Sequence, residues 1–234
     1  MAHNGTALII GVGPGLGISM AHRLGHEGFR VVLVSRNKTR HPTYLAALAA
    51  AGIEATAHAV DVTDTEAFGR VLKHIDTVDL AYYGPGPTDQ QIVPITEIDI
   101  PTAQSAFSWV WPAVRLAEAV LPGMIERGSG AFLLAGGLSS VRPMPALGQL
   151  ALASAALRNY ALTLHAELAD KGVYAGTLTI GGVVERGDIH AMVTADPAKY
   201  GAAEGHTLDP DRIAETAWEM CRTRERAEVV FDAL

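Results

Sequence analysis

The stretch 7–25, "ALIIGVGPGLGISMAHRLG", decides the fold. An apolar run typical of a buried β-strand leads into Gly11, Gly13, Gly15 and Gly17, and an amphipathic helical pattern follows directly. Closely spaced glycines permit a tight turn and let backbone amides approach a group bound at the start of a helix. The stretch therefore predicts a strand, a loop suited to the pyrophosphate of a dinucleotide, and a helix. A plain glycine-rich turn is the alternative.

The same alternation of strand-like and helix-like segments continues along the chain. Apolar runs predict strands at 6–10, 31–34, 55–62, 78–84, 130–137, 173–182 and 227–231. Helical patterns lie at 16–28, 42–51, 65–75, 103–121, 149–168 and 210–222. Continuous apolar strands separated by helices predict an α/β fold, a Rossmann-like doubly wound parallel sheet of about seven strands with helices on both faces.

The chain reads as a single domain over 1–234. It contains no internal repeat, low-complexity segment or linker rich in Pro, Gly and Ser. The segment 184–207 carries Gly, Pro and charged residues without helical periodicity, and we expect a substrate loop or a short helical lid there.

Composition and charge exclude several classes of function. The 234 residues carry a formal net charge of −7, which opposes binding to nucleic acid. The single Cys221 forms no internal disulfide and no thiolate zinc site, and His22 and His26 lack a third ligand, so we expect no metal. No apolar run reaches about 18 residues, the length needed to span a membrane. These features predict a soluble, cytoplasmic protein that binds a small molecule.

The end of the second predicted strand indicates which dinucleotide binds. An acidic residue there would bind the ribose hydroxyl of NAD, but this sequence has Ser35 followed by Arg36. Without a carboxylate to repel a phosphate, and with a guanidinium to pair with it, NADP(H) is favoured over NAD(H). A solvated surface charge is the alternative interpretation of Arg36.

Over nearly its full length the chain resembles the short-chain dehydrogenase/reductase family. The resemblance rests on the spacing of Gly11, Gly15 and Gly17, on "DVTD" from Asp61, and on "LPGMIERGSGAFLL" and "SAALRNYALTLHAEL". It implies an oxidoreductase that forms a homodimer or homotetramer through its fourth and fifth helices. The resemblance, together with the glycine loop and the residues at the end of the second predicted strand, gives these candidate cofactor-binding residues: Gly11, Gly13, Gly15, Leu16, Gly17, Ser35, Arg36, Asp61, Val62, Gly84 and Gly182.

The resemblance fails at the residues that move protons. The family uses an Asn, a Ser and a Tyr-x-x-x-Lys pair, in which Tyr transfers the proton and Lys lowers its pKa. At the corresponding positions this sequence has Trp109, Gly137, Leu150 and Ser154. A loop adjustment could return Ser139 or Ser140 to the site, whereas Tyr160 has no Lys four residues later and is interpreted as a packing residue.

Other residues could take over part of this chemistry. Tyr82 and Tyr83 end a strand at the carboxyl edge of the sheet, and since side chains alternate along a strand, only one of them faces the crevice. Tyr83 is the preferred candidate, as a proton donor or as a wall of the pocket, together with Arg142. Further candidates follow other strands: Glu185, Arg186, Asp188 and His190. Trp109 and Trp111 would stack on a flat substrate or pack in a subunit interface.

Three functions fit these patterns. The first is a reductase that transfers hydride from NADPH to an activated carbonyl or imine with an unusual, degenerate active site. The second is a non-redox enzyme, a cyclase or isomerase, on the same fold. The third is a cofactor-binding sensor or inactive subunit. The fold alone does not choose among these three functions.

Overall fold

The computed structural model describes residues 4–86 and 92–234 as alternating strands and helices. The strands are β1 (Thr6–Ile10), β2 (Arg30–Ser35), β3 (Ala55–Ala59), β4 (Leu80–Tyr83), β5 (Gly130–Gly137), β6 (Val173–Gly181), β7 (Val183–Val184), β8 (Thr207–Leu208) and β9 (Glu228–Asp232). The helices are α1 (Leu16–His26), α2 (His41–Ala50), α3 (Thr65–Leu72), α4 (Ile100–Ala106), α5 (Trp111–Arg127), α6 (Gly148–Leu168), α7 (Asp188–Ala195), α8 (Pro197–Tyr200) and α9 (Pro210–Thr223). Within these ranges no helix combines the length and the apolar character that crossing a bilayer requires.

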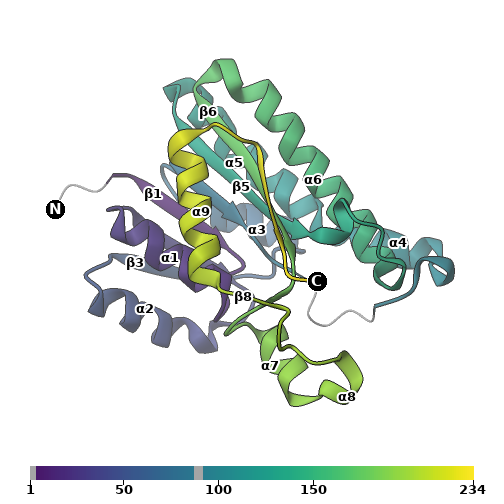
Figure 1. Ribbon diagram of the computed structural model, residues 1–234. Helices are drawn as coiled ribbons and strands as arrows, with labels where there is room; N and C mark the ends of the chain where they lie inside the picture. The colour runs from purple at the N-terminus through teal and green to yellow at the C-terminus, as the bar shows by residue number, and fades with distance from the viewer. Residues whose placement is uncertain (1–3, 87–91) are drawn as a thin grey trace.

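The main sheet has seven parallel strands in the order β3-β2-β1-β4-β5-β6-β9, which confirms the predicted fold class. Helices α1, α2 and α9 cover one face, and α3, α5 and α6 cover the other (Figure 1). Alternate residues of β1 enter the two cores: Leu8 and Ile10 pack toward α3, α5 and α6, and Ala7 and Ile9 toward the opposite layer. Burial on both faces explains why the strands are continuously apolar.

The order of the strands reverses between β1 and β4, and this creates a crevice at their carboxyl ends. Gly11 follows β1 and Gly84 follows β4, and Gly84 donates its backbone N–H to Ile10 at 3.0 Å. Gly11 has a φ of +88°, and a Cβ there would lie 2.6 Å from the backbone nitrogen of Pro85. Glycine is required at this point because the two chain segments pass so closely.

Two parts of the chain differ from the sequence-based expectation. The helix predicted over 103–121 is interrupted by the 3₁₀ turn Phe107–Trp109, and a new helix begins at Trp111 with Pro112 in its first turn. Proline has no N–H and a fixed φ, so it suits the start of a helix better than its interior. The segment 184–207 is not irregular throughout, since it contains α7 and α8 and is closed by the short parallel pair β7 and β8.

Candidate active site

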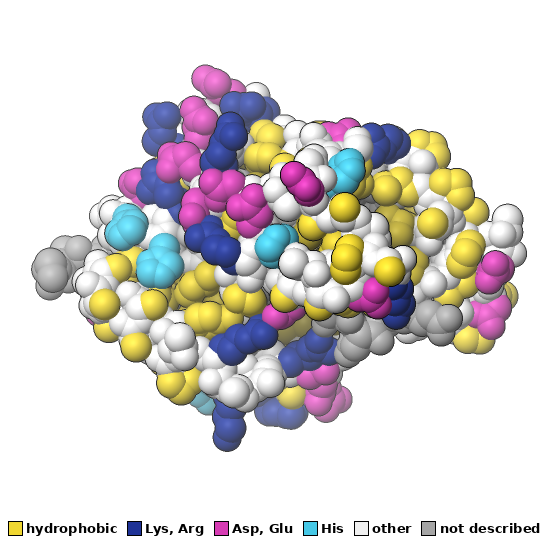
Figure 2. Space-filling model, turned by 60° about the horizontal axis from the view of Figure 1, so that its bottom comes forward, with side chains coloured by type: hydrophobic (Ala, Val, Ile, Leu, Met, Phe, Trp, Pro, Cys, Tyr) yellow, Lys and Arg dark blue, Asp and Glu magenta, His cyan; other side chains and the backbone are white. Residues whose placement is uncertain are grey.

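A cavity of about 890 Å³ lies at the carboxyl edge of the main sheet. Its walls come from the glycine loop, the ends of β2, β4 and β5, the start of α6 and the chain that leads from β6 into α7. Figure 2 turns the edge with α7 and α8 forward and shows hydrophobic side chains exposed there between charged ones. Every predicted cofactor residue except Asp61 lines this cavity: Gly11, Gly13, Gly15, Leu16, Gly17, Ser35, Arg36, Val62, Gly84 and Gly182.

The glycine loop forms the tight turn that the sequence predicts between β1 and α1. A Cβ on Gly17 would lie 2.7 Å from the Cα of Val12, so the loop backbone is packed against the first turn of the helix. A Cβ on Gly13, in contrast, would meet no atom within 4 Å. Gly15 is the N-cap of α1 and supplies no side-chain acceptor to the first N–H groups of the helix. A helix start of this kind can donate backbone hydrogen bonds to a phosphate.

The end of β2 brings positive charge to the cavity. Arg36 lines it, with its guanidinium carbon 5.9 Å from the centre of the Trp109 ring. The Ser35 hydroxyl lies 2.8 Å from Nε2 of the buried His41. Burial lowers the pKa of His41, which keeps this imidazole neutral near pH 7. The guanidinium of Arg36 is therefore not accompanied by a second cation from His41.

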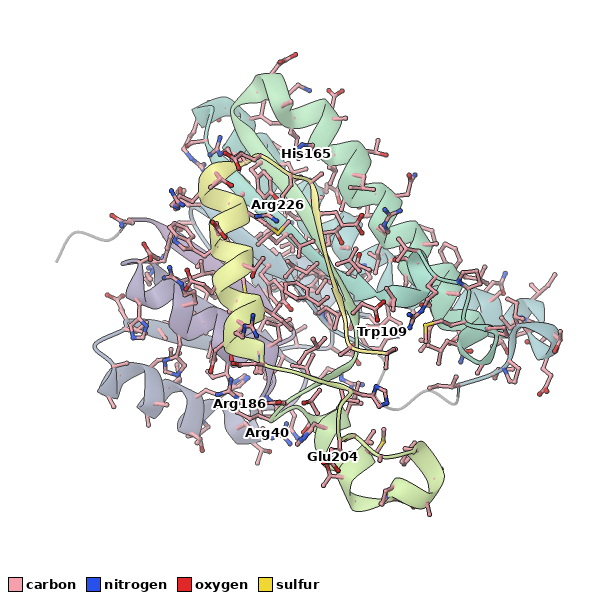
Figure 3. All side chains as sticks on the ribbon, viewed as in Figure 1. Arg40, Trp109, His165, Arg186, Glu204 and Arg226 are labelled. Atoms are coloured by element: carbon pink, nitrogen blue, oxygen red, sulfur yellow. The ribbon has the colours of Figure 1, made fainter. Side chains whose placement is uncertain are left out.

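The start of α7 is held over the glycine loop by two ion pairs. Arg40 donates two hydrogen bonds, of 2.7 and 2.8 Å, to the carboxylate of Asp188. Arg186 lies 2.7 Å from Asp211 at the start of α9. Figure 3 shows Arg40 and Arg186 near each other at the beginning of α7. A Cβ on Gly15 would lie 3.1 Å from the Cα of Gly187, so this segment packs directly on the loop.

The hydrogen bonds from Arg40 lower the pKa of Asp188, and they raise that of Arg40. Both charges therefore persist through the neutral range. Both residues line the cavity, which makes the pair part of its outer wall.

Four positions singled out in the sequence belong to the wall of the cavity. Trp109, Gly137, Leu150 and Ser154 all line it. The space that a Cβ on Gly137 would occupy lies 3.3 Å from Oγ of Ser154 and 3.5 Å from Oγ of Ser139. Ser139 is thus the loop serine that reaches this region.

The neighbouring Ser140 donates its hydroxyl to the Gly137 carbonyl at 2.8 Å and does not line the cavity. Two neutral hydroxyls, from Ser139 and Ser154, are therefore placed around the end of β5. Leu150 adds an apolar side chain to the same wall.

The expectation that Tyr83 faces the crevice is wrong. Tyr83 is fully buried, and its hydroxyl donates a 2.6 Å hydrogen bond to the backbone carbonyl of Trp109. Its side chain joins the core on the α5 side, whereas Tyr82 packs on the opposite face and lines the cavity. The Tyr82 hydroxyl fills the space that a side chain at Gly84 would need. Burial raises the pKa of both phenols, so they stay neutral near pH 7.

Several other candidates lie outside the cavity wall. Arg142 pairs with Asp232 at 3.1 Å instead of facing the cavity. Asp61 accepts hydrogen bonds from the backbone and hydroxyl of Thr63 and stabilises the turn after β3. Glu185 accepts a hydrogen bond from Thr207 and links β7 to β8.

Among the acidic and basic side chains proposed from the segment after β6, Asp188 is the one that lines the cavity; Glu185, Arg186 and His190 do not. Tyr160 packs half-buried against the core, in agreement with its interpretation as a packing residue. The rings of His22 and His26 on α1 are tilted by 45° to each other, with their centres 6.2 Å apart. Within residues 4–86 and 92–234, no group of three His, Cys, Asp or Glu side chains is placed to hold a metal ion.

Comparison with known proteins identifies the family. Residues 5–194 match the short chain dehydrogenase family. The chain belongs to this family. Its glycine loop, parallel sheet and cavity at the carboxyl edge are the structural counterparts of that match.

Individual short chain dehydrogenases resemble the chain at low identity. A dehydrogenase/reductase SDR family protein 7-like from Drosophila melanogaster is 28% identical over 239 residues, covering 96% of this chain and 72% of its own. A very-long-chain 3-oxoacyl-CoA reductase from Neurospora crassa is 27% identical, covering 71% of this chain and 52% of its own. The structure of a gluconate 5-dehydrogenase from Burkholderia cenocepacia in complex with NADP and tartrate superposes with a TM-score of 0.81 at 18% identity, covering 99% of this chain and 95% of the other.

Sequence reasoning missed many residues of this short chain dehydrogenase cavity, and Arg40, Met144 and Leu147 illustrate why. Arg40 was overlooked although it ends the basic segment "SRNKTR", which begins at the second strand. Met144 and Leu147 were overlooked because the loop before α6 has no periodic pattern that would mark an inward face. The basic segment is a usable signal, whereas the apolar loop residues carry none.

Proposed function

We propose that this chain is an NADP(H)-dependent reductase that transfers hydride to an activated carbonyl or imine without a Tyr/Lys pair. The observation that carries the proposal is one continuous cavity. It joins the glycine loop and Arg36 at one end to Leu150 and Ser154 at the other. A dinucleotide on the loop would therefore share the cavity with a small substrate.

The outer part of the cavity suits a phosphorylated cofactor. Ser35 presents a hydroxyl where a carboxylate would repel a 2′-phosphate, and Arg36 brings a charge that pairs with one. Arg40 adds a second guanidinium at the same end, although it is shared with Asp188. The NADP in the Burkholderia cenocepacia enzyme, a structural neighbour of this chain, supports the same choice of cofactor.

The inner part of the cavity favours particular substrates. Its wall near α6 is apolar, with Leu138, Met144, Leu147 and Leu150. The polar side chains there are Ser139 and Ser154, neutral donors that can hydrogen-bond an oxygen but supply no charge. Among the described residues of the wall there is no lysine to lower the pKa of a proton donor.

This chemistry separates iminium ions from simple ketones. Hydride addition to a neutral ketone produces an alkoxide, which must be stabilised by a proton or a positive group. Hydride addition to an iminium ion produces a neutral amine and requires no proton. We therefore propose an apolar cyclic imine, protonated to the iminium, or a strongly activated conjugated carbonyl as the substrate class.

The test is NADPH oxidation, followed at the nicotinamide absorbance band, with cyclic imines, conjugated carbonyls and simple ketones of matched size. We expect turnover of the activated substrates and little turnover of simple ketones. Equal turnover of simple ketones would contradict the substrate assignment. NADPH binding without any turnover would instead favour a sensor or inactive subunit, and no binding would favour a non-redox enzyme.

We also propose that the chain assembles as a homodimer or homotetramer through α5 and α6. These helices expose large apolar side chains at Trp111, Val114, Ile125 and Leu152. Covering them in a subunit interface would remove apolar surface from water. Light scattering at working concentration tests this proposal, and a monomer would contradict it.

A further inference from the structure

Trp109 and Arg36 form a pair in the wall of the cavity. The guanidinium carbon of Arg36 lies 5.9 Å from the centre of the indole ring, within the range of a cation–π contact. Trp109 as a whole is only 6% exposed. Trp109 lies in the 3₁₀ turn before α5. The pair thus joins the end of β2 to the start of α5.

The surroundings of Trp109 are apolar and close to the predicted phosphate site. Val60 and Val62, which follow β3, line the same cavity and belong to the same hydrophobic cluster as Trp109. The indole ring and these two valines make the apolar side of a slot whose charged cover is Arg36. A slot with an aromatic wall and a guanidinium suits a planar aromatic base, because both groups attract its π-face.

The two polar groups of Trp109 differ in their partners. Its backbone carbonyl accepts the 2.6 Å hydrogen bond from the buried Tyr83 hydroxyl, which fixes the residue in place. Its indole N–H is buried and has no hydrogen-bond partner among the described residues. A buried indole N–H normally has a partner. Because this N–H lies in the plane of the indole, a base stacked on the ring would not be its acceptor, and the part of Trp109 that a base can contact is the ring face beneath Arg36.

From these contacts we infer that the indole face of Trp109 is the binding surface for the adenine base of the cofactor. The inference rests on the proposed binding of NADP(H). The base takes the place of the Arg36 guanidinium on the ring, and Arg36 moves to the 2′-phosphate. Trp109 thereby has a binding role at a position where the sequence resemblance expects an Asn of the proton relay.

Fluorescence gives the first test, with tryptophan as the reporter. The chain has three Trp residues, so a protein carrying Trp111→Phe and Trp218→Phe reports on Trp109 alone. We expect adenosine 2′,5′-bisphosphate to quench this emission and nicotinamide mononucleotide, which has no adenine, to leave it nearly unchanged. Unchanged emission at saturating adenosine 2′,5′-bisphosphate, with binding established by calorimetry, would overturn the inference.

Calorimetry with side-chain variants gives the second test. Because stacking of a base on an aromatic ring is lost in Trp109→Leu, we expect its affinity for adenosine 2′,5′-bisphosphate to fall roughly fivefold to over a hundredfold. Trp109→Phe keeps a ring face but not the N–H, and we expect a smaller loss. The matched control is Trp111→Leu, since Trp111 is 56% exposed and does not line the cavity. Its affinity should not change.

The outcomes separate this inference from the proposed function. If Trp109→Leu binds NADPH and adenosine 2′,5′-bisphosphate as tightly as the wild-type protein does, the role of Trp109 is overturned. The proposed reductase activity would then still stand. Wild-type protein that binds neither would overturn both. If Trp109→Leu fails to fold, the single-tryptophan titration still decides, because it leaves Trp109 unchanged.

Discussion

Replacing Tyr83 by Phe distinguishes a structural phenol from a catalytic one. The variant loses the hydroxyl that donates to the Trp109 carbonyl at 2.6 Å in a fully buried setting. Leaving that carbonyl without its donor costs about 1–3 kcal/mol of the free energy of unfolding. For a chain of this size, each kcal/mol lowers the melting temperature by roughly 2–4 °C. We therefore expect a measurable loss of stability with little change in the rate of hydride transfer per folded molecule.

The assay combines chemical denaturation with NADPH oxidation by the best imine or conjugated carbonyl. Tyr82→Phe is the matched control, because it makes the same chemical change one residue earlier, at a hydroxyl that lies by the cavity. Its stability should change less than that of Tyr83→Phe. Loss of a general acid lowers the rate by about 10²–10⁴-fold. A fall of that size in Tyr83→Phe, at unchanged stability, would refute the structural role of this phenol.

Three further changes test the loop, the outer wall and the inner wall. Gly17→Ala should cost about 1–3 kcal/mol of stability by overpacking and should weaken NADPH binding. The control Gly13→Ala, whose Cβ would meet nothing within 4 Å, should fold normally. Equal melting curves for the two variants would contradict this prediction. Asp188→Asn should speed amide exchange in 183–195 at neutral pH at a cost of only about 0.2–1 kcal/mol, because the ion pair is half-exposed. Since the pKa of Asp188 is lowered in the folded chain, the wild-type ion pair is complete above the ordinary value of 3.8 and is lost as the pH falls below it; protection that is independent of pH would contradict this assignment. Leu150→Tyr combined with Ser154→Lys should create ketone reductase activity, and its absence in a folded, NADPH-binding variant would show that the inner wall is shaped for another reaction.

The fold was predictable because its signals are local. The apolar strands, the glycine loop and the helices between them all have the short-range periodicity that a parallel sheet covered on both faces imposes. The break before Trp111 was predictable in principle from Pro112, but the helical pattern on either side concealed it.

The site was predictable only where the backbone forms it. The glycine loop, Ser35 and Arg36 lie where their strands end, so their positions follow from the order of the elements. Which of Tyr82 and Tyr83 faces the cavity depends on the phase of a four-residue strand, and a shift of one residue exchanges the two faces.

Contacts between distant segments were beyond the reach of the sequence. Arg40 and Asp188 are 148 residues apart, and Arg142 and Asp232 are 90 apart, so no local pattern pairs them. The first pair keeps Asp188 in the outer wall, and the second turns Arg142 away from it. Side-chain roles that depend on such partners need the three-dimensional arrangement.

The most direct test of the central proposal is a paired calorimetric titration of NADPH and NADH into the wild-type protein and Arg36→Ala. Wild-type protein should bind NADPH more tightly than NADH. Arg36→Ala should lose roughly tenfold to over a hundredfold in NADPH affinity, as expected when a charge-assisted contact is removed, and little in NADH affinity. Equal losses for both cofactors, or no binding of either by the wild-type protein, would contradict the assignment of this cavity to NADP(H).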